Sequence, residues 1–499
     1  MTSWWPVVAI VAVVVATVGI GLFGVRVSRT TSDFLVASRS VSPMLNASAI
    51  GGEYLSAASF LGIAGLVLTY GVDMLWFPVG YTVGYLVLLV LVAAPLRRSG
   101  AYTLPDFAEM RTRSQKVRLT SSALVVLIGW LYLLPQLQGA GITLQALTGA
   151  PQWVGSLVVA VVVGITVATG GMRSITVVQA FQYWLKLVAI ALPAVLLVAA
   201  WYGDGAPVFT DGGWGEPLSG YGGREYPLYS TYSILLATFL GTMGLPHVLV
   251  RFYTNPDGRA ARRTTLAVLG LLSVFYVFPP VLGALGRVYA PELAGTDQAD
   301  TIVLRLPALV FEGWPGQALS ALVAAGAFAA FLSTASGLSV SVAGVLSQDL
   351  LRHDGRLGDG VRRFRLGTVI AVVVPFLLAL VAGRANLAQT VTLAFAVAAS
   401  TFCPLLVLGI WWPRLTSRGA LAALWVGGGT ALFAVVLVLA AGPFTGIVGA
   451  LLGQPAAWTV PLAFAAAIIV SLRTSDRGRR TADAAMARLH APEELDTRR

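Results

Sequence analysis

The chain contains very little cysteine, histidine and charge. Among 499 residues there are one cysteine, Cys403, and three histidines, and only 11% of the residues are charged. A single cysteine excludes an internal disulfide and a cysteine cluster for a metal. Three separated histidines argue against a zinc site, and we find no P-loop for ATP. We therefore expect no enzyme activity, no organic cofactor and no zinc or cysteine-bound metal.

Long apolar runs are the main feature that is present. Hydrophobic residues make up 57% of the chain, and the mean hydropathy is +0.80. A soluble globular domain does not need so much apolar sequence. The composition predicts an all-α polytopic membrane protein embedded in the lipid bilayer, and the net charge of +11 does not indicate a nucleic-acid partner.

Apolar runs bounded by charge, glycine or proline predict thirteen transmembrane helices. The expected spans are residues 4–24, 43–70, 75–95, 118–148, 152–170, 174–201, 230–252, 264–289, 316–349, 366–383, 386–411, 419–441 and 456–472. In the first, Arg26 and Arg29 follow the apolar run, whereas a signal peptide has its charges first. With the N-terminus outside, most of the 33 basic residues fall on the inner side, as the positive-inside rule requires. The C-terminus is then cytoplasmic.

The second span, residues 43–70, combines apolar length with polar interruptions. It contains Gly51 and Gly52, followed by Glu53, Tyr54, Ser56 and Ser59. A carboxylate at this depth is costly unless it has a partner or lines a cavity. A glycine pair lets a helix open, and the freed carbonyls can then bind a cation. The alternative is a helix whose small residues only allow close packing.

Spans two to six and seven to eleven form two sets of five that cross the membrane in opposite directions. This is the topology of an inverted repeat, in which the binding site lies between the first helices of the two halves. The first helix of the second half carries Gly241, Thr242, Gly244 and then Pro246, which predicts a second break. We expect a first helix with its link (1–42), a transport core (43–411, with repeats 43–201 and 230–411), two peripheral helices (412–472) and a cytoplasmic tail (473–499). A short amphipathic helix is expected near 480–490 of this tail, and the acidic outer loops 202–229 and 290–315 are expected to be solvated surface.

Hydroxyl side chains are dense in residues 328–341, which include Ser333, Thr334, Ser336, Ser339 and Ser341. Hydroxyl and carbonyl oxygens are the ligands that hard cations prefer. Serines in a membrane helix usually only bond to their own backbone, so the hydroxyl cluster alone is weak evidence for a cation site. The glycine break in the second span strengthens that prediction.

Lys186 is one of two lysines and lies deep in the sixth span, where its amine cannot easily reach water. It could pair with Glu53, attract a substrate carboxylate, bind and release a proton, or face an aqueous vestibule without a role. His247 follows Pro246, which breaks the helix. It could take part in proton coupling, or it could only pack against its neighbours. Arg251 is assigned to the inner end of its helix, with a structural role.

Several segments resemble the sodium:solute symporter family, in particular its cation/acetate and monocarboxylate branch. They are GEYLSAASFLGIAG (52–65), YTLPDF (102–107), QLQGAG (136–141), TGGMRS (169–174), GLPHVLVRFYTNPDGRAAR (244–262) and AAFLSTASGL (329–338). The match covers roughly residues 30 to 420. The resemblance implies a LeuT-like 5+5 inverted repeat with three peripheral helices, and Na⁺-coupled uptake by alternating access.

The resemblance also implies a cation site and a substrate site. The Na⁺ ligands would be the carbonyls of Gly52, Leu55 and Ala330 and the hydroxyls of Ser333 and Thr334. The substrate would lie near Tyr54, Ser56, Ser59, Thr242 and Met243, with Trp76 and Phe77 as gates. From their charge and depth in the membrane, and not from the resemblance, we add Glu53 and Lys186 to the expected substrate residues. The chain departs from the family at Gln179, where relatives that use Na⁺ carry an aspartate, and this departure weakens the expectation of Na⁺.

The expected function is Na⁺-coupled symport of a short monocarboxylate such as acetate, propionate or pyruvate across the plasma membrane. An anionic substrate suits the positive ends of half-helices. Two alternatives stay open: an H⁺-coupled or amino-acid symporter of the same fold, and a transporter-like membrane solute sensor. The residues after 473 are too few for an attached signalling domain, which argues against the sensor. The sequence does not specify the substrate, the stoichiometry or the oligomeric state.

Overall fold

A computed structural model describes residues 4–25, 41–208, 212–351, 360–381, 387–442, 444–474 and 479–491. Within these ranges all regular structure is helical, which confirms the all-α prediction. The first half contains α1 (Trp5–Val25), α3 (Pro43–Tyr54), α4 (Ile63–Tyr70), α5 (Trp76–Val87), α6 (Ala93–Arg98), α7 (Leu104–Thr112), α8 (Gln115–Thr148) and α9 (Gln152–Gly203). The second half contains α10 (Pro227–Gly244), α11 (Pro246–Phe252), α12 (Gly258–Phe275), α13 (Phe278–Tyr289), α14 (Ile302–Val310), α15 (Trp314–Val345), α16 (Gly360–Val381) and α17 (Leu387–Trp411). The last helices are α18 (Ser417–Ala441), α19 (Gly446–Gly453), α20 (Ala456–Arg473) and α21 (Arg479–His490).

Ten helical segments of the described chain are long and apolar enough to cross a membrane, or eleven if the bent pair α10–α11 counts as one span. The 52-residue α9 has a non-helical backbone at Gly171 (φ 57°, ψ −164°). A straight helix of that length would measure about 78 Å, more than twice the thickness of the hydrocarbon core. Gly171 lies between the spans predicted at 152–170 and 174–201. The total of thirteen spans stays a prediction, as does the division into domains.

Two helices, α15 and α17, are enclosed by neighbouring helices on several sides. In the most apolar 18-residue stretch of each helix, 83% of the residues of α15 and 89% of those of α17 are buried. Alanine, glycine, serine and threonine are frequent in both helices, and such small residues let neighbouring helices approach closely. α15 packs against α1, α3, α8 and α9, and α17 packs against α8, α10, α18 and α20.

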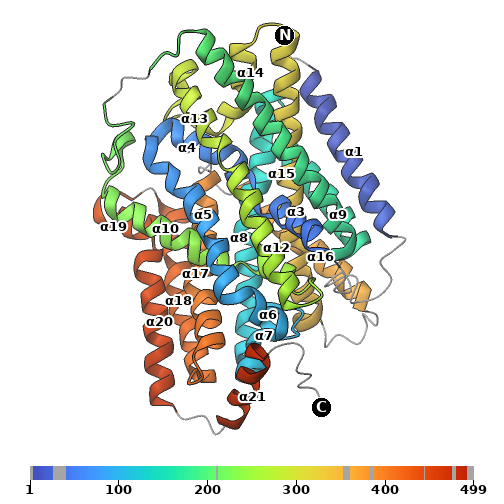
Figure 1. Ribbon diagram of the computed structural model, residues 1–499, viewed down its shortest axis with the longest axis vertical. Coiled ribbons are helices and arrows are strands. Elements are labelled where there is room, and N and C mark those ends of the chain that lie inside the picture. Colours follow the sequence, from blue (N-terminus) through green and yellow to red (C-terminus); the bar gives the residue numbers. More distant parts are fainter. Residues whose placement is uncertain are drawn as a thin grey trace.

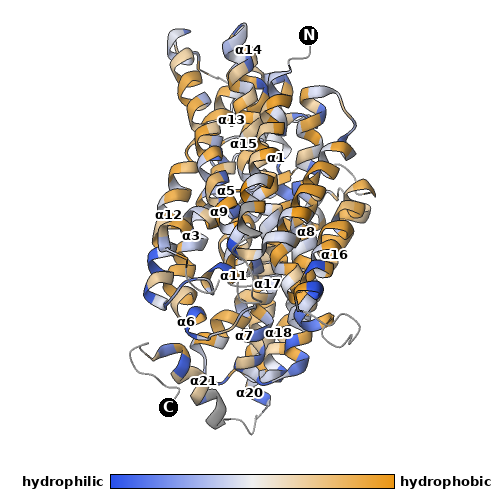
Figure 2. Ribbon diagram, turned by 90° about the vertical axis from the view of Figure 1, so that its right-hand side faces the viewer, coloured by the Kyte–Doolittle hydropathy of each residue, from blue (hydrophilic) through white to orange (hydrophobic). Residues whose placement is uncertain are grey.

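Apolar residues cover the length of the helices, and many hydrophilic residues gather at the two ends (Figure 2). α1 begins at one end of the bundle and α21 lies at the opposite end (Figure 1). The helix expected near 480–490 is confirmed as α21. It is attached to the core, because Leu489 is buried and the His490 ring lies 2.8 Å from the Ile410 carbonyl oxygen.

One of the two acidic loops, residues 290–315, is not wholly solvated, so that expectation was wrong in part. Asp300 is buried, and its carboxylate accepts a hydrogen bond of 3.2 Å from the Leu387 amide. Gly65 explains the close approach, since a Cβ at this glycine would lie 2.5 Å from Asp300 Oδ1. The loop before α14 is thereby fixed against α4 and the start of α17.

Candidate cation and substrate site

The α3 helix ends at Tyr54, and a π-helical turn, Ala58–Gly62, follows it. Between them Leu55 has φ −73° and ψ 84°, outside the helical range, so the regular hydrogen-bond pattern stops and carbonyl oxygens are freed. A Cβ at Gly52 would lie 2.1 Å from the Gln179 carbonyl oxygen. The second glycine therefore allows α3 to lie directly against α9, and the break faces that helix.

Three of the predicted cation ligands surround one nitrogen atom. Lys186 Nζ, on α9, donates to the Gly52 carbonyl, to the Leu55 carbonyl at 2.8 Å and to Ser333 Oγ at 2.9 Å. Lys186 has no exposed surface. The structure thus places Lys186 among the predicted cation ligands, rather than with Tyr54 and Thr242 of the predicted substrate group.

The other two predicted ligands lie in the same place. Ser333 Oγ donates to the Ala330 carbonyl at 3.1 Å, and Thr334 Oγ1 donates to the Glu53 carbonyl at 2.7 Å. All five predicted residues therefore meet where the opened α3 crosses α15. We call this group, Gly52, Leu55, Ala330, Ser333 and Thr334, the cation cradle.

Glu53 is paired with Arg251, which lies in the last turn of α11 as predicted but is almost fully buried. Arg251 Nε lies 2.7 Å from Glu53 Oε2, and both side chains are almost fully buried. Arg251 also donates to Thr176 Oγ1 at 2.8 Å and to Gln179 Oε1. Arg251 is therefore held within the bundle, on the short helix α11 that follows the break at Leu245.

Gln179, which departs from the family pattern, joins this ion pair to the cation cradle. Its Nε2 donates to the Ser333 carbonyl at 2.7 Å while its Oε1 accepts from Arg251. A carboxylate there could not donate to the Ser333 carbonyl, whereas an amide can both donate and accept. The negative charge in this region is carried by Glu53.

The predicted substrate residues Tyr54 and Thr242 meet at the centre of the bundle. Their hydroxyl oxygens lie 2.6 Å apart, which links α3 to α10. The Tyr54 ring packs edge-on against Tyr85, with ring centres 4.8 Å apart, and lies 6.2 Å from the Phe395 ring. A Cβ at Gly84 would lie 2.5 Å from Thr242 Cβ, so this glycine lets α5 carry Tyr85 close to α10.

The remaining predicted substrate residues border this aromatic cluster. Ser59 Oγ lies 2.9 Å from the Tyr276 hydroxyl. Ser56, at the break, and Met243, near the end of α10, are buried. Of the two predicted gates, Phe77 is buried and lies 6.2 Å from the Tyr81 ring, whereas Trp76 is 40% exposed.

Four residues of the cluster were not found from the sequence: Tyr81, Tyr85, Tyr132 and Phe395. Tyr81 and Phe395 have ring centres 5.1 Å apart, and Tyr132 packs against His247 at 5.3 Å. The GYTVGY motif (80–85) places its tyrosines four residues apart, on one face of a helix. That spacing, with a glycine before each tyrosine, is the one signal that could have identified two of them.

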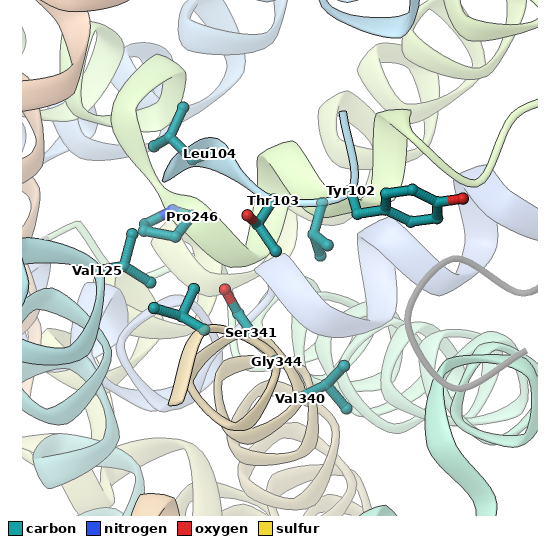
Figure 3. A pocket seen from close by; sticks show the side chains of 10 residues that line it. Tyr102, Thr103, Leu104, Val125, Pro246, Val340, Ser341 and Gly344 are labelled. Atoms are coloured by element: carbon teal, nitrogen blue, oxygen red, sulfur yellow. The ribbon is translucent and has the colours of Figure 1, made fainter. Parts of the chain in front are cut away.

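Two cavities differ greatly in size. One of about 530 Å³ lies near the end of the bundle where α1 begins, and its walls include Tyr70, Gln145, Asp297 and Arg305. The other, of about 10 Å³, lies between Thr103, Pro246 and Ser341 (Figure 3), with room for about one water molecule. The first residues of α11 are thus closely covered by α15 and by the segment that precedes α7.

Comparisons with known proteins agree with this architecture. The model of the sodium:solute symporter family matches residues 34–427. An uncharacterised symporter of Bacillus subtilis (strain 168), YwcA, is 33% identical over 487 residues, covering 93% of this chain and 94% of that protein.

Two solved transporters share the fold. One is a Na⁺-coupled sialic acid symporter in a substrate-bound outward-open state, with a TM-score of 0.72 and 15% identity over 95% of this chain and 98% of the other. The second is the nucleobase-cation-symport-1 family transporter Mhp1 in a closed conformation, with a TM-score of 0.57 and 17% identity over 92% of this chain and 99% of the other.

The family match and the long B. subtilis relative settle the membership, while the two solved structures show the fold. The predicted family and fold class are therefore confirmed. This chain belongs to the sodium:solute symporter family: it is a multi-pass membrane protein that carries out secondary active symport with Na⁺ as the coupling ion, and it is not an enzyme.

Proposed function

We propose that the protein imports a short monocarboxylate, such as acetate, propionate or pyruvate, together with Na⁺. The cation cradle would bind Na⁺ and the aromatic cluster around Tyr54 would bind the solute. The cation draws the opened α3 against α15, and this movement completes the solute site. Import into the cell fits a plasma membrane location with the N-terminus outside and the C-terminus cytoplasmic.

The cradle supports the cation part of the proposal by its chemistry. It brings two freed main-chain carbonyls and the Ser333 hydroxyl around a single point, which the Lys186 amino group occupies. Oxygen ligands around a monovalent cation are what Na⁺ requires, as hard cations do generally. No group of three or more His, Cys, Asp or Glu side chains that could hold a metal ion occurs in the described part of the chain.

The observation that carries the substrate class is a set of buried polar atoms without partners. The Tyr85 hydroxyl and both ring nitrogens of His247 form no hydrogen bond within the described residues. Buried polar groups are nearly always bonded, so these atoms indicate a place for a polar ligand. A phenolic hydroxyl and an imidazole N–H are donors, and a carboxylate offers only acceptors.

The packing of the cluster favours a small solute. Tyr54 lies between Tyr85 and Phe395, and Tyr132 lies between Phe395 and His247, with ring centres 4.8 to 6.2 Å apart. Aromatic rings at these distances are already in contact. A two- or three-carbon acid needs only a modest separation of the rings, whereas a sugar needs several of them to move.

The two cavities suit alternating access. The wide one lies near the end of the bundle that is predicted to be outside, and the small cavity beside Pro246 has room for only about one water molecule. Once the solute and Na⁺ have bound, the change to the inward-facing state would widen the cavity that Thr103, Pro246 and Ser341 line.

The test is uptake of labelled acetate into proteoliposomes, first under an imposed Na⁺ gradient and then under a proton gradient. Uptake should follow the Na⁺ gradient and collapse in the Ser333→Ala, Thr334→Ala double variant. The matched control is Ser320→Ala, which changes a buried serine elsewhere on the same helix. Uptake driven only by protons and insensitive to the double variant would contradict the cation part, and failure with all three acids would contradict the substrate class.

The same assay separates the alternatives. Labelled amino acids tested beside the three acids distinguish an amino-acid symporter. A solute that binds the purified protein but never accumulates in vesicles would indicate a sensor.

A further inference from the structure

We propose that the Lys186 ammonium is a tethered occupant of the cation cradle, so that Na⁺ and this side chain bind there in turn. Na⁺ enters as Lys186 withdraws, and Lys186 returns when Na⁺ has left. The inference rests on the proposed cation site and adds a competitor that the chain itself carries.

The hydrogen bonds match a charged amine. The three oxygens around Nζ are the Gly52 and Leu55 carbonyls and Ser333 Oγ. The carbonyls can only accept, and Ser333 already donates its proton to Ala330, so all three oxygens accept from Nζ. An ammonium has three donors and no acceptor. Every N–H is therefore used, and the amine has no donor left for a substrate carboxylate.

The position of Nζ leaves no space for Na⁺ beside it. Na⁺ would use the same Gly52 and Leu55 carbonyls and the same Ser333 hydroxyl. Two cations at hydrogen-bond distance from the same oxygens repel each other strongly in a medium of low dielectric constant. Occupation by one cation thus excludes the other.

The charged neighbours support exchange rather than addition. Glu53 is the carboxylate that interacts electrostatically with Lys186, and it is already paired with Arg251. The hydroxyls of Ser333 and Thr334 on α15 are neutral. Adding Na⁺ at these oxygens while the ammonium stays there would place two positive charges side by side, with no carboxylate among the described residues left to pair with either, which is costly in a membrane.

This arrangement has a use in the transport cycle. A symporter must return to the outward-facing state without its cargo, and the cradle oxygens would then lack a cation. The ammonium satisfies those carbonyls and holds the break of α3 against α15. Lys186 would therefore support the return of the empty carrier to the outward-facing state. It would contribute nothing to counterflow, in which the carrier crosses in both directions with solute and Na⁺ bound.

The first test measures Na⁺ binding without any substrate. Thermal unfolding of the purified protein is followed as choline chloride is replaced by NaCl at constant ionic strength, and the half-saturating Na⁺ concentration is read from the shift in Tm. A tethered group competes at an effective concentration of millimolar or more. We expect Lys186→Met to lower the half-saturating Na⁺ concentration at least about tenfold. Lys116→Met is the matched control, since Lys116 is the other lysine and is exposed.

The Ser333→Ala, Thr334→Ala double change, made both in the unchanged protein and in Lys186→Met, shows where Na⁺ binds. If it weakens Na⁺ binding in both but Lys186→Met leaves the affinity unchanged, the cradle stands and the lysine inference is overturned. If it has no effect in either background, the cation site of the proposed function is also wrong. Should Lys186→Met fail to fold, Lys186→Gln gives the same comparison.

A transport readout separates this role from a purely structural one. Net Na⁺-driven acetate uptake requires return of the empty carrier, whereas counterflow of labelled against unlabelled acetate does not. In Lys186→Met the ratio of net uptake to counterflow should fall at least fivefold. An equal loss of both rates would overturn the role in the return step.

Discussion

Arg251 Nε lies 2.7 Å from Glu53 Oε2 in the interior of the bundle. Glu53 is next to the last residue of α3, and Arg251 is next to the last residue of α11. The pair therefore joins the two broken helices, one from each predicted repeat. Glu53 also connects the ion pair to the cation cradle, because its carbonyl accepts a hydrogen bond from Thr334.

Removal of one partner of this ion pair should destabilise the protein. Glu53→Gln leaves the Arg251 guanidinium buried without its counter-charge, which costs about 3–5 kcal/mol. Thermal unfolding in detergent should show a large fall in Tm, and Glu53→Gln combined with Arg251→Met should be less destabilised than the sum of the two single changes. Glu292→Gln, which changes an exposed carboxylate in the loop before α14, serves as the control. A Tm equal to that of the control would disprove the pairing.

Gly337 should tolerate no side chain. A Cβ at this position on α15 would lie 2.1 Å from Glu53 Oε1, and the ion pair prevents Glu53 from moving away. Gly337→Ala is expected to cost about 1–3 kcal/mol by overpacking and to lower transport. Gly429→Ala, in α18 with no atom within 4 Å of the added Cβ, should fold normally. Equal expression and Tm of the two variants would contradict this account of the packing.

The Tyr85 hydroxyl should affect substrate affinity without affecting stability. Because this buried oxygen has no hydrogen-bond partner within the described residues, Tyr85→Phe removes no bond from the protein. A hydrogen bond to a charged ligand contributes about 1.5–3 kcal/mol, so the KM for acetate should rise roughly tenfold or more.

Tyr229→Phe is the comparison for that variant. The Tyr229 hydroxyl donates to the Gln454 carbonyl at 2.8 Å, away from the cluster, so this change should lower the Tm slightly and leave the KM unchanged. An unchanged KM in Tyr85→Phe would remove this tyrosine from the substrate site.

The residues of the cradle could be predicted from the sequence, but their occupant could not. The glycine pair at 51–52 and the hydroxyls within 328–341 indicate the break and a facing helix, and the resemblance to the family supplies the five ligand residues. The depth of Lys186 in the membrane follows from counting residues. Its partners depend on how α9 is rotated against α3, which is set by the contacts of Gly52 with the Gln179 carbonyl.

Arg251 and the aromatic cluster show two limits of reading a sequence. Arg251 precedes a basic stretch at 259–263, and this neighbourhood placed it at a helix end, where it lies, but its burial and its pairing with Glu53 could not be read from that position. Tyr132 and Phe395 lie in long apolar helices, where an aromatic residue gives no periodic signal that separates a binding surface from packing.

The most direct test of coupled transport is the effect of acetate on ²²Na⁺ entry into proteoliposomes that contain the purified protein. If the two are carried together, external acetate should increase ²²Na⁺ entry severalfold, and the Ser333→Ala, Thr334→Ala variant should abolish the increase. If labelled acetate accumulates while ²²Na⁺ entry stays the same with and without acetate, Na⁺-coupled symport of this solute is contradicted.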